Sequence, residues 1–171
     1  MRGRMASTLA VGLLWAGTAA AETGKAELKA TAEGSTVSGL ATLADTEGGL
    51  RVDVRVAGVP QGQHGLHIHE AGDCGDGGKA SGGHFNPENV PHGFRPKDGP
   101  AKAHPGDMGN IDVGAGGTGS LTVTLPGVRL TGAPAAVSGR AIVLHEKVDD
   151  FGQPTGNAGG RIGCGPIVLT K

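Results

Sequence analysis

The sequence predicts an all-β protein, an antiparallel sandwich or barrel of about eight short strands. Glycine supplies 34 of the 171 residues and aromatic residues only 2%, a composition that favours short strands and turns over helices. From residue 50 to residue 56, leucine and valine alternate with arginine and aspartate, the pattern of a strand with one buried face. No convincing helical period is present. Abundant glycine can also indicate disorder, but the apolar residues keep strand-like periods and show no collagen-type repeat.

Eight segments have strand-like composition and are separated by turns rich in glycine, proline and aspartate. They are residues 25–32, 37–44, 50–59, 65–70, 109–113, 120–125, 141–146 and 166–170. The span between the fourth and fifth segments, residues 71–108, is too long for an ordinary connection in a compact domain, and such loops are usually functional. A bound metal and a disulfide can order a loop that buries little apolar surface. We therefore expect a long metal-binding loop there.

Residues 1–21 have the features of a signal peptide. Arg2 and Arg4 supply positive charge, and residues 5–17 are largely apolar. Three alanines at residues 19–21 match the rule that small residues precede a signal-peptide cleavage site. The apolar stretch is short of the ~20 residues that cross a bilayer, so a retained anchor is the weaker alternative. We predict cleavage before Glu22, export to the periplasm or the medium, one domain at residues 22–171, and no membrane contact after cleavage.

Charge and cysteines narrow the class further. Of the 15 lysines and arginines, two are lost with the signal peptide, and the rest oppose 16 aspartates and glutamates. This balance does not favour nucleic acid or an anionic membrane as a partner. Cys74 and Cys164 are the only cysteines, and pairing is the default expectation after export. A disulfide between them would close the chain from residue 74 to residue 164 into one loop. A loop of this length would stabilise the fold by about 4–5 kcal/mol on the chain-entropy model. Two free thiols or a soft-metal site are the alternatives.

The histidines point to bound metal. His67 and His69 stand two apart in a strand segment, so both imidazoles project from one face. Three imidazoles and a carboxylate further along suit a divalent ion such as zinc. They belong to His84, His92, His104 and Asp107. His64 falls on the opposite face of its strand, and we expect it to form hydrogen bonds in the core rather than bind metal.

Five sequence elements occur in a characteristic order. They are HGLHIHE at residues 64–70, GHFNP at 83–87, the pair His104 and Asp107, LHEKVDD at 144–150, and GNAGGRIGCG at 156–165. Together they resemble the copper/zinc superoxide dismutase family. The resemblance implies a Greek-key arrangement of the eight strands, with a long metal-binding loop and a shorter second active-site loop.

The resemblance also implies two metal sites that share one histidine. Copper would be bound by His67, His69, His84 and His145. Zinc would be bound by His84, His92, His104 and Asp107. Imidazole binds both oxidation states of copper, whereas a ligand set that contains oxygen suits zinc, whose valence does not change.

Three further roles follow from the same resemblance. Arg161 would attract and orient the superoxide anion, and His84 would return a proton during the reaction. Asp149 would accept hydrogen bonds from His69 and His92. Asp150 is the next residue along, so this assignment is open by one position.

Two features depart from the eukaryotic pattern and favour a bacterial-type member. Residues 93–103 make the zinc-binding segment longer, and the loop at residues 150–156 is short and lacks the charged cluster that guides superoxide in the eukaryotic branch. Steering would then depend on Arg161, with Lys97, Lys102 or Lys147 as further candidates.

From this resemblance we predict an oxidoreductase that converts two superoxide anions to oxygen and hydrogen peroxide while copper is alternately reduced and reoxidised. A copper and zinc store or carrier is one alternative, and a binding sandwich with a structural metal is another. Arg161 favours the enzyme, because storage needs no guide for an anion. Superoxide is the expected small-anion partner, and a homodimer is a weaker expectation.

Overall fold

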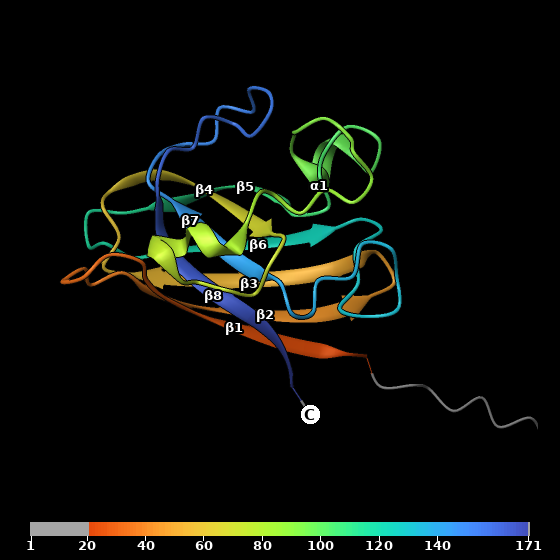
Figure 1. Cartoon of the computed structure of the whole chain (residues 1–171), viewed down its shortest axis with the longest axis horizontal. Helices are drawn as coiled ribbons and strands as arrows, with labels where there is room; N and C mark the ends of the chain where they lie inside the picture. Colours follow the sequence, from red (N-terminus) through yellow and green to blue (C-terminus); the bar gives the residue numbers. More distant parts are fainter. Residues whose placement is uncertain (1–20, 171) are drawn as a thin grey trace, which may run out of the picture.

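Eight antiparallel strands close into a barrel in the computed structural model, which describes residues 21–170 (Figure 1). The strands are β1 (Thr23–Ala30), β2 (Ser38–Thr46), β3 (Gly49–Ala57), β4 (Gly62–His69), β5 (Asp107–Val113), β6 (Gly119–Leu125), β7 (Ala141–His145) and β8 (Arg161–Thr170). Their order around the barrel is β1-β2-β3-β6-β5-β4-β7-β8, and β8 pairs with β1 to close it. The predicted eight-stranded antiparallel fold is confirmed. The predicted signal peptide lies outside the described residues except for Ala21.

The connections form a Greek key. β4, β5 and β6 are neighbours in the barrel, and β7 returns after a long connection to pair with the free side of β4. The resulting order β7-β4-β5-β6 is the Greek-key pattern. Leu66 pairs with Leu144, and His69 pairs with Ala141. The fold therefore places histidines that are far apart in the sequence on adjacent strands.

The barrel core follows the alternation seen in the sequence. On β3, Leu50 and the valines at positions 52, 54 and 56 are buried, whereas Arg51 and Arg55 are exposed. β7 differs because all five of its residues are buried. Its second face is covered, since Cys74 and Cys164 pack against Ala141 and Val143. A short strand that is apolar on both faces is expected where another layer covers the sheet.

The largest difference from the predicted strands is at β8, which begins at Arg161 rather than at residue 166. The glycines in this stretch suggested a loop. In the barrel, a Cβ atom at Gly165 would lie 2.6 Å from the carbonyl oxygen of Glu27, so the strand needs glycine where it passes close to β1. Two short helices, η1 (Asp76–Ser81) and α1 (Arg95–Asp98), are also absent from the prediction. They are too short to show a helical period.

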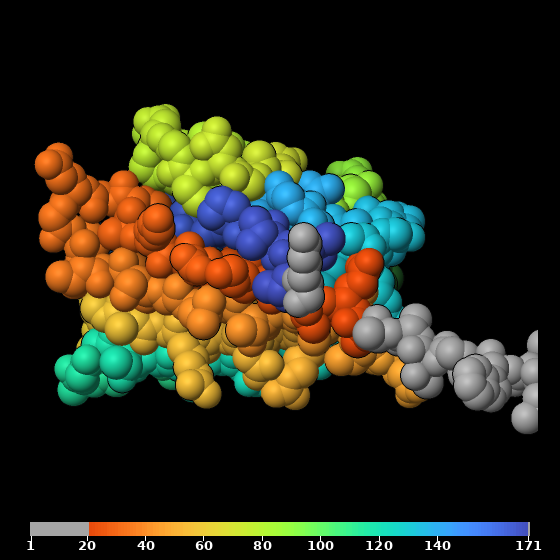
Figure 2. Space-filling view, turned by 90° about the horizontal axis from the view of Figure 1, so that it is seen from below, coloured from red at the N-terminus to blue at the C-terminus, as the bar shows by residue number. Residues whose placement is uncertain are grey.

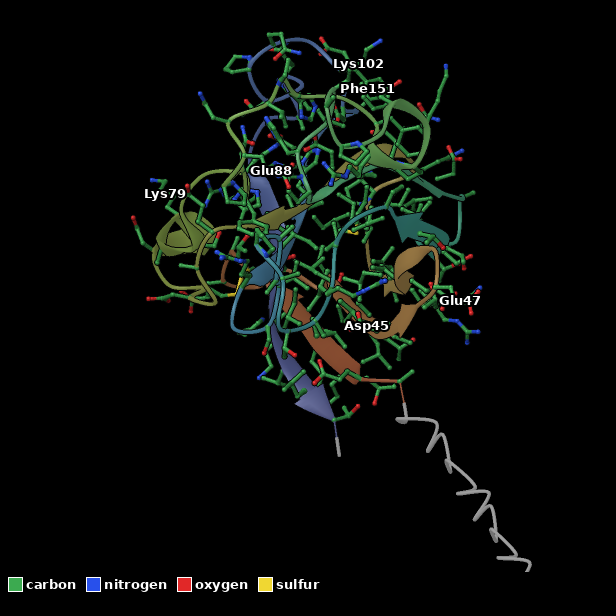
Figure 3. The ribbon with its side chains drawn as sticks, turned by 90° about the vertical axis from the view of Figure 1, so that its right-hand side faces the viewer. Asp45, Glu47, Lys79, Glu88, Lys102 and Phe151 are labelled. Atoms are coloured by element: carbon green, nitrogen blue, oxygen red, sulfur yellow. A yellow bond between two sulfur atoms is a disulfide. The ribbon has the colours of Figure 1, made fainter. Side chains whose placement is uncertain are left out.

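Three segments outside the strands surround the histidines. The disulfide segment (residues 71–82) holds η1 and lies on β8 (Figure 2), where Cys74 and Cys164 form a disulfide. The histidine loop (residues 83–106) holds α1, which contacts β5 and β6. The β7–β8 loop (residues 146–160) contacts the histidine loop, since the His92 amide donates to Gln153 Oε1 at 3.0 Å. Figure 3 shows Lys102 and Phe151 at the same end of the molecule. Within residues 21–170, no helix has the length and apolar character needed to cross a membrane.

Candidate metal centre

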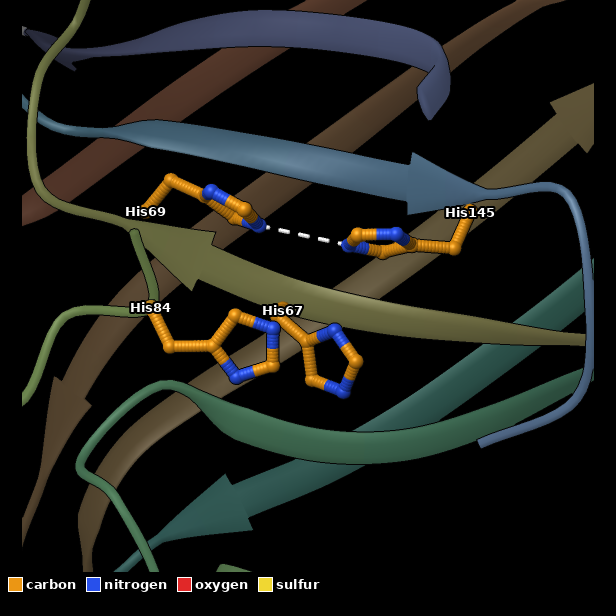
Figure 4. Close-up of side chains that lie close together, drawn as sticks. All are labelled: His67, His69, His84 and His145. Atoms are coloured by element: carbon orange, nitrogen blue, oxygen red, sulfur yellow. Dashed lines mark hydrogen bonds between the residues drawn. The ribbon is translucent and has the colours of Figure 1, made fainter. Parts of the chain in front are cut away.

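Four histidines from three parts of the chain converge on one point (Figure 4). His67 and His69 come from β4, His145 ends β7, and His84 is held beside His69 by an isolated β-bridge. One ring nitrogen from each lies within 4.8 Å of the others. The imidazoles are almost fully buried, and even the His84 side chain is only 6% exposed. The strand therefore presents His67 and His69 to the same site, as its alternation predicts.

Hydrogen bonds fix which nitrogen of each ring remains free. His67 Nε2 donates to Asp149 Oδ2 at 2.8 Å, and His69 Nδ1 donates to the Gly82 carbonyl oxygen at 3.0 Å. His145 Nδ1 is 3.4 Å from the Gly159 carbonyl oxygen. Carboxylate and carbonyl oxygens only accept hydrogen bonds, so these ring nitrogens carry the protons. The opposite nitrogen of each ring therefore presents a lone pair to the centre of the group.

The free lone pairs fit a bound cation. His69 Nε2 and His145 Nε2 lie 3.2 Å apart (Figure 4). Both are the unprotonated nitrogens of their rings, so neither can donate a hydrogen bond to the other. The Nδ1 atoms of His67, His84 and His92 are buried without a well-aligned hydrogen bond, and the nearest acceptor of the last two is the Asp107 carboxylate, at 3.5 Å from His84 Nδ1 and 3.0 Å from His92 Nδ1. Buried polar atoms are rarely left unpaired without a reason. A metal ion that accepts the lone pairs of several imidazoles would satisfy them together.

A second group adjoins the first and shares His84. His67, His84, His92 and Asp107 also bring one ligand atom each within 4.8 Å of the others. His67 has a single free nitrogen, because its Nε2 is committed to Asp149, so it can serve only one cation. His104 contributes instead through Nδ1, which is 3.1 Å from Asp107 Oδ1. The second group then contains three imidazoles and one carboxylate, a suitable set for zinc.

The second group also carries negative charge, as expected of a site that binds a cation. Burial alone would raise the pKa of Asp107, but contacts from His104, His84 and His92 outweigh it and hold the pKa well below its ordinary value. Burial opposes the charged form of His92, yet Asp107 and Asp149 together raise its pKa to about 9. Two carboxylates thus flank one imidazole, and the negative charge that retains a second proton on His92 in the metal-free protein also favours a metal ion in place of that proton.

Three imidazoles of the first group, those of His69, His84 and His145, stay neutral. Burial lowers the pKa of His69 to about 3, with smaller contributions from nearby positive groups. Burial also lowers the pKa of His84 to about 4, although Asp107 opposes this shift, and it lowers the pKa of His145 as well. Neutral imidazole is the form that binds metal. These nitrogens therefore need not lose a proton before they bind an ion at neutral pH.

Asp149 joins the two groups, but one of its partners differs from the prediction. Its carboxylate accepts from His67 Nε2 at 2.8 Å and from His92 Nε2 at 3.0 Å, whereas the family resemblance implied His69 in place of His67. The antiparallel pairing explains the difference, because the chain leaves β7 beside the N-terminal half of β4. The Gly65 amide donates to the Lys147 carbonyl oxygen there, at 2.8 Å. The adjacent Asp150 accepts from Gly152 and Asn157 instead.

Arg161 lies at a pocket that opens onto the first group. The pocket has a volume of about 380 Å³, and its walls include His69, His84, His145 and Arg161. The guanidinium donates to the carbonyl oxygens of Gly78 and Gly82, each at 2.6 Å, and to Ser81 Oγ at 3.0 Å. The disulfide segment therefore holds the guanidinium beside the candidate copper ligands. Burial lowers the pKa of Arg161, but a guanidinium keeps its charge in proteins.

The remaining predicted residues divide between the pocket and the core. The Lys147 side chain lies against Gly159, which lines the pocket, whereas Lys97 and Lys102 belong to the histidine loop and do not line it. His64 is 3% exposed, and its two ring nitrogens lie 2.9 Å from the carbonyl oxygens of His145 and Pro60. It therefore forms hydrogen bonds in the core, as its position on the strand predicts.

Two residues that support Asp149 are not identified by the sequence. Asn110 accepts from the Asp149 amide at 2.7 Å and donates to its carbonyl oxygen at 2.9 Å, so β5 holds its backbone on both sides. Gly156 has a φ of +74°, and a Cβ there would overlap Asp149 and crowd His92. Glycine and asparagine are common in turns and strand ends, so neither residue stands out without the fold.

The closed barrel and the two histidine groups define a β-barrel protein with a buried site suited to two adjacent metal ions. A family model described as copper/zinc superoxide dismutase matches residues 37–167. The chain belongs to this family. It is also similar to a solved structure described as a crystal structure of the clock protein EA4, with 36% sequence identity and a TM-score of 0.76. That match covers 90% of this chain and 98% of the other.

Proposed function

We propose that the protein is a superoxide dismutase that uses copper and zinc. The copper ligands are His67, His69, His84 and His145, and the zinc ligands are His84, His92, His104 and Asp107. The observation that carries the proposal is the set of buried, unpaired histidine nitrogens directed at one another. When bound, copper supplies one-electron redox chemistry, whereas zinc keeps a fixed valence.

The chain supplies the substrate guide. Superoxide is a small anion, and Arg161 places a permanent positive charge at the wall of the pocket that leads to His69, His84 and His145. The guanidinium has five N–H donors, and its contacts with the disulfide segment leave some of them free to bind a ligand. Arg161 therefore attracts the anion and orients it in the pocket.

The chain also supplies a place to hold a proton, which the formation of hydrogen peroxide requires. His84 Nδ1 is 3.5 Å from Asp107 Oδ1, so its Nε2 lies on the side of the ring that faces away from Asp107. We assign proton transfer to this nitrogen.

A second candidate is a metal-storing or otherwise non-enzymatic role on the same fold. The observation in its favour is the clock protein named for the similar solved structure, and a fold alone does not fix function. The presence of Arg161 at the pocket favours the enzyme.

One assay separates these functions. The full-length mature protein is loaded with copper and zinc, its metal content is measured, and its consumption of superoxide is followed. Rapid consumption that requires copper supports the proposal. Protein that holds both metals and does not consume superoxide contradicts it and favours the storage role.

Export and assembly are part of the same proposal. We propose that the chain is exported and cleaved before Glu22. An oxidising compartment outside the cytoplasm is compatible with the Cys74–Cys164 disulfide. Sequencing of the mature N-terminus tests the cleavage position. A homodimer is the proposed assembly, and sedimentation that shows only monomer at micromolar concentration would contradict it.

A further inference from the structure

Arg95 is the bulkiest of the fully buried side chains in the described part of the chain. It begins α1, three residues after His92, and α1 contacts β5 and β6 (Figure 1). Burial lowers the pKa of its guanidinium, while Glu88 and Asp107 oppose this shift. A charged group in such a place is costly unless its donors are paired.

The guanidinium is paired mainly with backbone carbonyl groups. Its Nη1 donates to the Ala103 oxygen at 2.8 Å and to the Pro100 oxygen at 3.2 Å, and its Nε donates to the Pro126 oxygen at 2.9 Å. The Glu88 carboxylate is further away, at 3.6 Å from Nη1. Arg95 therefore connects two points of the histidine loop to the end of β6.

These contacts act on the segment between two candidate zinc ligands. Ala103, whose carbonyl group Arg95 holds, immediately precedes His104. The amides of His104 and Gly93 both donate to Asp107 Oδ2 at 2.9 Å. A shift of Ala103 would therefore disturb His104 and its hydrogen bond to Asp107 at the same time.

We infer that Arg95 is a positioning residue of the zinc site, which fixes the Ala103 and Pro100 carbonyl groups against Pro126 and so holds His104 and Asp107 in place. The inference rests on the proposed zinc site. An apolar side chain would leave buried carbonyl groups without their donor. Lysine keeps the charge but lacks the planar fork that reaches several acceptors from one position.

The test compares metal binding in four variants of the full-length mature protein. Arg95→Met removes the donors, and Arg95→Lys keeps the charge. Glu88→Gln removes the more distant carboxylate. Arg129→Met is the matched control, because Arg129 also donates to a backbone carbonyl group, that of Thr46 at 2.8 Å, on a part of the barrel without candidate ligands. Zinc and copper affinities are measured separately by chelator competition, and cobalt(II) absorption reports the geometry of the zinc site.

We expect Arg95→Met to weaken zinc binding by about tenfold or more, the effect typical of residues that orient metal ligands. Copper binding should change much less, and the cobalt(II) spectrum should lose its tetrahedral character. Arg95→Lys should give an intermediate zinc affinity. Glu88→Gln and Arg129→Met should bind both metals like the unsubstituted protein.

Unchanged zinc affinity in Arg95→Met overturns the inference, and so does a parallel loss of zinc and copper. Failure of both Arg95 variants to fold, with Arg129→Met folded, also overturns it, since Arg95 would then support the barrel as a whole. If the unsubstituted protein itself binds no zinc, the proposed function fails and the inference falls with it. The comparison of unsubstituted protein with Arg95→Met thus distinguishes the two failures.

Discussion

Asp149 offers a sharp test of the two-metal arrangement because its carboxylate contacts one histidine from each group. Asp149→Ala would leave the Nε2 protons of His67 and His92 buried without an acceptor. Each unpaired buried donor costs about 1–3 kcal/mol, so the metal-free protein should lose about 2–6 kcal/mol of stability. Affinity for copper and for zinc should each fall by about 10- to 100-fold, because both histidines lose the group that orients them.

Asp149→Asn should be milder, because the amide keeps one oxygen acceptor while its NH₂ group faces the other histidine. The matched control is Asp150→Ala, since Asp150 accepts hydrogen bonds only from the β7–β8 loop in the described structure. Chelator competition for each metal and thermal unfolding of the metal-free protein provide the two readouts. If only one metal is weakened, or if Asp150→Ala has the same effect, Asp149 does not join the two sites.

Three more predictions concern the substrate guide, the metals and the disulfide. Arg161→Ala should keep both metals, lower the second-order rate of superoxide consumption by about tenfold and flatten the dependence of that rate on ionic strength, because salt screens the attraction. Pulse radiolysis at several salt concentrations measures the rate, and an unchanged dependence on salt would exclude steering by Arg161. His84→Ala should weaken copper and zinc together, whereas His104→Ala should weaken mainly zinc, and equal losses in both variants by metal analysis would contradict the ligand assignment. Reduction of Cys74 and Cys164 should lower the stability by about 4–5 kcal/mol on the chain-entropy model, as measured by unfolding with and without reductant; two free thiols in the exported protein, found by mass spectrometry, would refute the pairing.

The sequence predicts the barrel well because local patterns determine most of it. Alternation on β3 and the turn residues between strands are readable without the fold, and each of the eight predicted segments overlaps a strand. The start of β8 could not be predicted, since glycine at Gly165 serves a close approach to β1 that depends on the closed barrel. Local sequence cannot distinguish such a glycine from one in a loop.

In the candidate site, too, some features follow from local sequence and others depend on the fold. The residue types at His67, His69 and His84 indicate metal binding directly, but which histidine meets Asp149 depends on how β7 pairs with β4. Arg95 is another case, because in the sequence it is a charged residue in a polar loop. Only the closing of the histidine loop over β5 and β6 buries its side chain.

The pairing of β1 with β8 has a consequence for how the protein is made. β1 pairs on one side with β8, which is more than 100 residues later in the chain, so the ring cannot close until β8 has been synthesised. Until then β1 has an open edge, which can pair with other chains. Such distant pairing also slows folding. A chain whose barrel cannot yet close stays open longer, which is compatible with the predicted export through a channel that accepts unfolded chains.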